Sequence, residues 1–132
     1  MPIKKLIQEA LNTQKRAYAP YSKFYVGAAV LGENDRIYCG CNIENASYGL
    51  TICAERNAIF QMVTDQMYCI KALAIVGSCD QPCAPCGACR QVIREFAKPN
   101  TSIFLCNQRG ELLITTTLEE LLPHSFGPDF LK

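Results

Sequence analysis

Apolar residues near the start of the chain recur with the period of an α-helix. Five of them follow the i, i+3, i+4, i+7, i+8 spacing that places side chains on one helical face. They are Ile3, Leu6, Ile7, Ala10 and Leu11. This pattern predicts a helix over about residues 3–16, which the proline-containing segment Ala19-Pro20-Tyr21-Ser22 then ends.

Two kinds of strand pattern follow. Val26 to Leu31 is an apolar run with many β-forming residues, Gly32 to Asp35 has turn composition, and Arg36 to Asn42 returns, so these three segments predict a β-hairpin. Lys71 to Gly77 reads KALAIVG and is almost wholly apolar. Such a run is typical of a central strand that is buried on both faces of a sheet.

The remaining segments complete an alternation of helices and strands. A second helix is predicted to start at Cys53 and run through Val63, and a third to start at about Gly87 and bury Val92, Ile93 and Phe96. Further predicted elements are strands at 102–106 and 112–116, a short helix at 118–122 and a tail from Pro123 to Lys132. The resulting order α-β-β-α-β-α-β-β predicts one domain over residues 1–132, of the α/β class, with a mixed five-stranded sheet in a three-layer α/β/α arrangement.

Composition narrows the classes of function. Apolar residues make up 49% of the chain and charged residues 19%, and the net charge is +1 without a run of basic residues. A nucleic-acid groove needs a basic stripe, so a small substrate is expected and a nucleic-acid partner is not. No apolar stretch is long enough for a membrane span and the N-terminus lacks a signal-peptide core, which favours a cytoplasmic protein. The nine cysteines are then expected to be reduced thiols.

Two cysteine segments form a candidate metal site. Cys53-Ala54-Glu55 and Pro85-Cys86-Gly87-Ala88-Cys89 each lie where a loop is predicted to enter a helix. Helix N-termini present free N–H groups and the positive end of the helix dipole, which favour thiolate over thiol. Cys86 and Cys89 can therefore bind one ion from one helix, with Cys53 as a third ligand from another.

Three protein ligands leave a tetrahedral zinc ion one position for water, as in catalytic zinc sites. Three thiolates weaken the acidifying effect of zinc on that water, and Arg56 is the expected compensating cation. Glu55 could lie beside the water without binding the metal and transfer its proton to a leaving group.

Other interpretations of the cysteines stay open at this point. The other six cysteines could supply a fourth ligand and close a structural zinc site; they are Cys39, Cys41, Cys69, Cys79, Cys83 and Cys106. Cys83, Cys86 and Cys89 resemble part of an iron–sulfur run, but position 93 is Ile where the fourth cysteine would stand. Cys86 and Cys89 alone also have the spacing of a redox dithiol.

Several segments together resemble the cytidine deaminases of the small, zinc-dependent class whose subunits form homotetramers. The resemblance covers nearly the whole chain in the right order. The matching segments are Ala19 to Phe24 with Val26 to Ala29, Asn42 to Tyr48, Cys53 to Arg56, Pro85 to Gln91, and Ser125 to Pro128.

The resemblance implies hydrolytic deamination of cytidine and 2′-deoxycytidine to uridine and 2′-deoxyuridine, with one Zn²⁺ per subunit held by Cys53, Cys86 and Cys89. It implies that Glu55 relays protons to the ring nitrogen and to the departing amine. It implies substrate contacts from Phe24, Asn42, Ile43, Glu44 and Ala54, and from neighbouring subunits through Ala46, Tyr48 and Phe126.

Three rival functions remain at the level of sequence. A related deaminase could act on a nucleoside-like antibiotic such as blasticidin S, although the intact Asn42 to Asn45 stretch favours an ordinary ribose. Two rivals are not deaminases. One is a binding module that zinc stabilises without catalysis, and the other is an iron–sulfur or thiol-redox protein. The sequence does not distinguish ribose from deoxyribose, and Cys79 and Cys83 have no assigned role.

Overall fold

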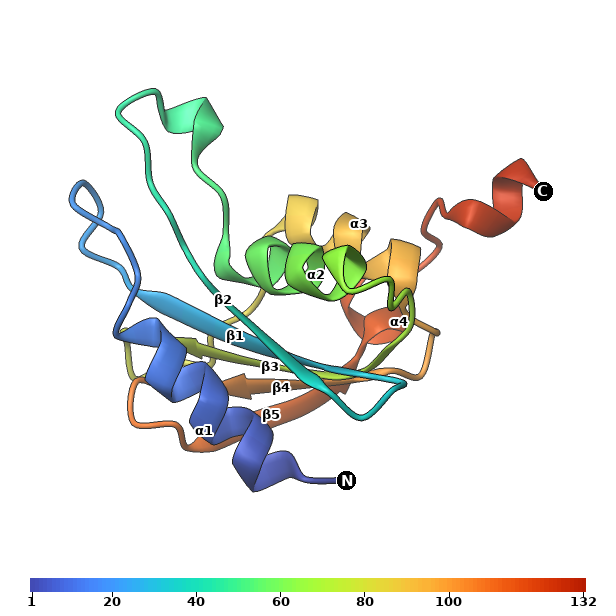
Figure 1. Cartoon of the computed structure of the whole chain (residues 1–132), viewed down its shortest axis with the longest axis horizontal. Coiled ribbons are helices and arrows are strands. Elements are labelled where there is room, and N and C mark those ends of the chain that lie inside the picture. The colour runs from blue at the N-terminus through green and yellow to red at the C-terminus, as the bar shows by residue number, and fades with distance from the viewer.

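A five-stranded mixed sheet with helices on both faces forms the molecule (Figure 1). The computed structural model describes all residues, 1–132. The strands are β1 (Val26–Gly32), β2 (Ile37–Cys41), β3 (Ile70–Gly77), β4 (Ser102–Cys106) and β5 (Leu112–Thr117), and the α-helices are α1 (Ile3–Gln14), α2 (Ala54–Thr64), α3 (Gly87–Phe96) and α4 (Leu118–Leu121). Two short 3₁₀ helices cover Tyr48–Leu50 and Pro128–Leu131. The predicted three-layer α/β/α class and element order are confirmed.

The strands lie in the order β2-β1-β3-β4-β5. The predicted hairpin is the antiparallel pair β1 and β2, and β1 also pairs antiparallel with β3. Strands β3 and β4 are parallel, because α3 carries the chain back across the sheet between them, and β5 returns antiparallel to β4. The long loop between β2 and α2 and the loop after α1 project beyond the sheet, as Figure 1 shows.

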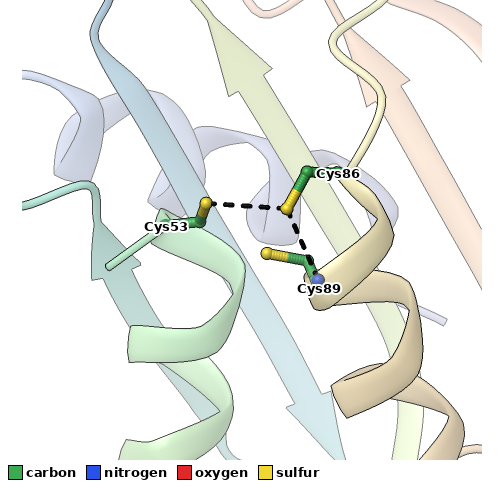
Figure 2. A group of neighbouring side chains, drawn as sticks. All are labelled: Cys53, Cys86 and Cys89. Atoms are coloured by element: carbon green, nitrogen blue, oxygen red, sulfur yellow. Dashed lines mark hydrogen bonds between the residues drawn. The ribbon is translucent and has the colours of Figure 1, made fainter. Parts of the chain in front are cut away.

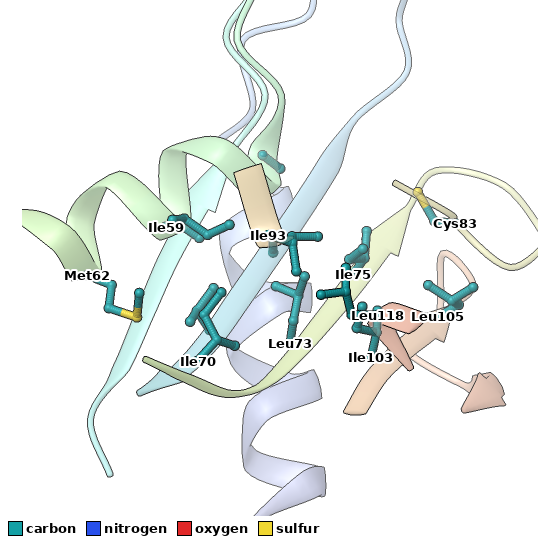
Figure 3. Close-up of a cluster of buried hydrophobic side chains, with 14 residues drawn as sticks. Ile59, Met62, Ile70, Leu73, Ile75, Cys83, Ile93, Ile103, Leu105 and Leu118 are labelled. Atoms are coloured by element: carbon teal, nitrogen blue, oxygen red, sulfur yellow. The ribbon is translucent and has the colours of Figure 1, made fainter. Parts of the chain in front are cut away.

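Strand β3 lies at the centre and is buried on both faces, as its apolar sequence predicts. Its small residues Ala72 and Ala74, with Val76, pack in the layer of α1. Its larger residues Leu73 and Ile75 face α2 and α3 and join the core cluster that Figure 3 shows around Ile59 and Ile93. The period-2 alternation of the strand thus separates two cores.

Two glycines let the helices approach the sheet closely. A Cβ added at Gly27 on β1 would lie 2.0 Å from the Ala10 carbonyl oxygen of α1. A Cβ added at Gly40 on β2 would lie 2.3 Å from the Ala58 nitrogen and 2.6 Å from the Ala54 oxygen of α2. The first turn of α2 therefore rests directly on the backbone of β2.

The ends of some elements differ from the sequence-based prediction. Helix α1 ends at Gln14 rather than 16, and α2 begins at Ala54 with Cys53 as its N-cap. On α3 only Ile93 of the three expected core residues is buried, whereas Val92 and Phe96 lie at the margin of the core. No helix combines the length and the apolar character needed to cross a membrane.

Substituting Gly40→Ala is expected to destabilise the fold, because the added methyl group meets helix backbone that cannot move alone. The free energy of unfolding should fall by about 3 kcal/mol, at the upper end of the usual cost of overpacking. Urea unfolding followed by circular dichroism measures it. Gly49→Ala is the control, since nothing lies within 4 Å of its added Cβ. Equal stability of the two variants would contradict the close approach.

Candidate metal centre

The N-termini of α2 and α3 meet on one face of the sheet and bring three cysteines together (Figure 2). Cys53 is the N-cap of α2, and Cys86 is the N-cap of α3, with Cys89 in the first turn of that helix. The ligand atoms of the three lie within 4.8 Å of one another. The sequence-based grouping of Cys53 with the C-x-x-C pair is therefore reproduced in space.

The spacing of the sulfur atoms fits one zinc ion. A Zn–S bond of about 2.3 Å in a tetrahedral site puts neighbouring sulfurs about 3.8 Å apart. The Sγ atoms of Cys53 and Cys86 are 3.8 Å apart. Cys86 is exposed and Cys89 is buried, so an ion held by the group would lie at the boundary between solvent and core. The donor set and its spacing thus fit zinc with one position left open.

Local charge favours a thiolate at Cys53. Hydrogen bonding from the Cys89 thiol and from the Arg56 guanidinium lowers the pKa of Cys53 to about 5, although burial acts in the opposite direction. The Arg56 Nη2 atom lies 3.5 Å from the Cys53 sulfur and donates to it. The same contact raises the pKa of Arg56 above its ordinary value. Arg56 therefore lies where a cation that offsets thiolate charge was expected.

Glu55 lies in the first turn of α2 and is only 4% exposed. Burial raises the pKa of Glu55 to about 7, and the negative charge at Cys53 adds to the effect. A buried carboxyl group whose pKa lies near neutrality can both accept and donate a proton under physiological conditions. Its environment thus suits proton transfer beside the three sulfurs.

Cys83, the nearest competitor in the sequence, lies outside the group of three sulfurs. It is part of the apolar core, and its sulfur faces Gly77 at the end of β3. Burial raises the pKa of Cys83 to about 12, which disfavours the thiolate that a metal requires. The remaining cysteines are free as well, and none of them joins the cluster.

The expected substrate-binding residues fall into two groups. Asn42 and Glu44 stand at the start of the long β2–α2 loop, and Phe24 lies beside Gly77 at the end of β3. Asn42 is buried; its amide accepts from the Val26 N–H and donates to the Phe24 carbonyl. One donor and one lone pair of that amide remain for a ligand.

Glu44 is held by a residue that sequence reasoning did not single out. Its carboxylate accepts hydrogen bonds from the Tyr21 and Ser22 backbone N–H groups and from the Ser22 hydroxyl. These bonds lower the pKa of Glu44, the Ser22 hydroxyl first. Ser22, Glu44 and Tyr48 are among the residues that line a cavity of about 370 Å³. No sequence spacing links Ser22 to Glu44, because the loops meet only in the folded chain.

The second group consists of more exposed residues on the β2–α2 loop and the C-terminal tail. Ile43 is half exposed and forms bridges with Tyr18 and Ile52 at the base of the β2–α2 loop. Ala46 and Tyr48 lie exposed farther along this projecting loop, and Phe126 lies on the C-terminal tail, which leaves the body on another side (Figure 1). Within one chain, the structure does not bring these last three residues to the cysteines.

Comparisons with known proteins agree on one family. The model of the cytidine and deoxycytidylate deaminase zinc-binding region matches residues 2–106. A cytidine deaminase of Sporosarcina psychrophila is 48% identical over 132 residues, covering 100% of this chain and 96% of that protein. One of Halalkalibacterium halodurans is 46% identical over 121 residues, covering 92% and 91% of the two chains.

A solved structure extends the likeness to the fold. The crystal structure of cytidine deaminase from Burkholderia pseudomallei matches with a TM-score of 0.90 and 44% identity, covering 96% of this chain and 100% of that one. The sequence similarity and the fold therefore extend together over almost the full length.

The metal-free chain should show one unusually reactive thiol. Because the pKa of Cys53 is lowered to about 5, its thiolate dominates at pH 6, whereas buried Cys106, whose pKa is raised to about 11, stays protonated. Iodoacetamide labelling followed by peptide mass spectrometry should modify Cys53 and spare Cys106. The Cys53 rate should fall as the pH drops through about 5. A rate that instead climbs through pH 9 would contradict the shift.

Removing one sulfur should release the metal. Cys86→Ala is expected to reduce zinc content well below one ion per chain and to lower the melting temperature, because metal binding and folding are coupled. Cys83→Ala is the matched control: it should keep zinc and lose only about 1 kcal/mol of stability from the small cavity. Metal analysis after dialysis measures both, and loss of zinc from Cys83→Ala alone would reverse the assignment.

Proposed function

The chain belongs to the cytidine and deoxycytidylate deaminase family, and from this premise we propose that it deaminates cytidine and 2′-deoxycytidine hydrolytically. The products are uridine and 2′-deoxyuridine with ammonia, a reaction of pyrimidine salvage. One observation carries the proposal: three sulfurs with zinc spacing stand at two helix N-termini beside a buried carboxyl group.

Cys53, Cys86 and Cys89 would hold the zinc ion, which supplies a Lewis acid with one open position for water. Glu55 would take a proton from the attacking water and deliver it to the ring nitrogen beside the reacting carbon. It would then take the remaining proton of the added hydroxyl group and deliver it to the departing amine. Its pKa of about 7 suits a group that must take up and release a proton twice in each turnover. The Arg56 guanidinium would offset part of the negative charge of the three thiolates.

The nucleoside would lie between the two projecting loops and the end of β3. Asn42 and Glu44 would bind the ribose hydroxyls, and the bonds from Ser22 hold the Glu44 carboxylate in a fixed orientation for this task. Phe24 would pack against the base. The Ala54 N–H would meet the base carbonyl; as the first residue of α2, Ala54 has no helical partner for that N–H. Ile43 would line the same nucleoside site.

We infer that the active site is completed in a homotetramer. Ala46, Tyr48 and Phe126 would reach a neighbouring subunit's site. Two of them are large apolar side chains that a single chain leaves exposed, Tyr48 at 73% and Phe126 at 55%. Exposed aromatic residues of this kind are enriched in protein interfaces. The nine free cysteines favour a reducing compartment such as the cytoplasm.

Zinc-loaded protein should convert cytidine to uridine, measured as loss of cytosine absorbance together with ammonia release. Glu55→Gln should lower kcat by about 10²–10⁴-fold, because the amide cannot transfer a proton, while zinc stays bound. The matched control is Glu95→Gln, an exposed position on α3. Wild-type protein that binds zinc without turning over cytidine would sink the proposal.

Sites shared between subunits make a mixing experiment decisive. Phe126→Ala chains keep their own Glu55, and Glu55→Gln chains keep Phe126. Each variant alone should be nearly inactive or bind cytidine weakly. Tetramers assembled from both should regain activity well above either, since some sites would combine an intact Glu55 with a neighbour's Phe126. Activity that merely averages that of the two parents would show that each site lies within one chain.

A further inference from the structure

One arginine of α3 holds the C-terminal tail. Arg94 Nε donates to the Ser125 hydroxyl oxygen at 2.9 Å. Its Nη2 atom forms an ion pair with the Asp129 carboxylate at 2.7 Å. Two atoms of one planar guanidinium thus contact residues on either side of Phe126 and Gly127.

Gly127 allows the guanidinium to lie directly against the tail. A Cβ added there would stand 2.3 Å from Arg94 Cζ and 2.4 Å from Nη1. The backbone of Gly127 is extended, so the glycine is required by this contact and not by its dihedral angles. Gln91, one turn earlier on α3, donates to the Phe126 carbonyl at 3.0 Å. Arg94 therefore holds the side chains of Ser125 and Asp129 on either side of Phe126, and Gln91 holds the Phe126 backbone itself.

The Phe126 ring packs against a second aromatic residue of the tail. It stacks on Phe130, with ring centroids 5.1 Å apart and an interplanar angle of 29°. Phe130 is itself 63% exposed, so the aromatic pair has little support from the core of its own chain. The Arg94 side chain, by contrast, is only 20% exposed. The fixed part of the contact is thus on α3.

We propose that Arg94 is a positioning residue that sets Phe126 for contact with the nucleoside in a neighbouring subunit. The proposal rests on the proposed function, since it assigns Phe126 to the substrate. Arg94 acts only through the tail and touches neither the sulfurs nor Glu55. A planar fork that satisfies Ser125 and Asp129 together is a property of arginine that lysine lacks.

The test compares Arg94→Ala, Arg94→Lys, Gly127→Ala and the double variant Arg94→Ala/Gly127→Ala with wild type. The methyl group added by Gly127→Ala should displace the Arg94 guanidinium without removing its charge. Arg36→Ala is the control, because Arg36 forms an exposed ion pair with Asp65, away from the tail. Hydrogen exchange of residues 123–132, zinc content, and kcat and KM for cytidine are measured on the zinc-loaded oligomer.

Arg94→Ala should speed hydrogen exchange in the tail and raise KM about tenfold, the scale of losing one aromatic contact to a base, with kcat changed less than threefold and zinc retained. Gly127→Ala should do the same, the double variant should be no worse than either, and Arg94→Lys should recover only part of the loss. Tail exchange or KM unchanged in both single variants would overturn the proposal. Wild-type protein without cytidine turnover would instead overturn the proposed function. The hydrogen-exchange data would still test whether Arg94 holds the tail.

Discussion

The convergence of two helix N-termini on one face of the sheet is the constraint on which the site depends. Three thiolates repel one another, and each loses hydration as it approaches the core. The free N–H groups and positive dipole ends of α2 and α3 offset part of that cost, as does Arg56 against the Cys53 sulfur. The close packing of α2 on β2 at Gly40 fixes one of these helix ends. The position of the Cys53 ligand therefore depends on a glycine that does not itself touch the metal site.

The same arrangement places a carboxyl group where its proton is exchangeable at neutral pH. Glu55 follows Cys53 by two residues and turns toward the core at the first turn of α2. Burial raises the pKa of Glu55, and proximity to thiolate charge raises it further. A bound cation would act in the opposite direction, so the protonation state of Glu55 and occupancy of the metal centre are coupled. Ligands and proton carrier thus form one electrostatic unit.

The sequence predicts those features that depend on local pattern. Helical spacing at Ile3 to Leu11, the apolar run of β3 and the loop-to-helix placement of Cys53 and Cys86 are all confirmed, because each reflects a local periodicity or a cap. That placement also grouped Cys53 with Cys86 and Cys89 while other ligand sets stayed open, and the resemblance to a family favoured this set. Cys83 was excluded only by the fold, which places its sulfur in the apolar core.

Contacts between distant segments could not be predicted in this way. Ser22 meets Glu44 across two loops, and Arg94 meets residues 125–129 across more than thirty positions of sequence. Neither contact leaves a periodic or motif-like trace, because the side chains meet through tertiary packing alone. The outward position of Tyr48 and Phe126 is likewise visible only once the loop and tail are seen to leave the body of the chain.

Helix α3 carries metal ligands at its start and the residue that holds the C-terminal tail farther along. Its first turn carries Cys86 and Cys89, and Arg94 follows about 7.5 Å farther along the axis, at 1.5 Å per residue from Cys89. If the tail contacts a neighbouring subunit, a rigid shift of α3 would move both the sulfurs of its own metal centre and the tail residues at the next subunit's substrate site. In an assembly of that kind, the position of one helix would bear on two substrate sites at once.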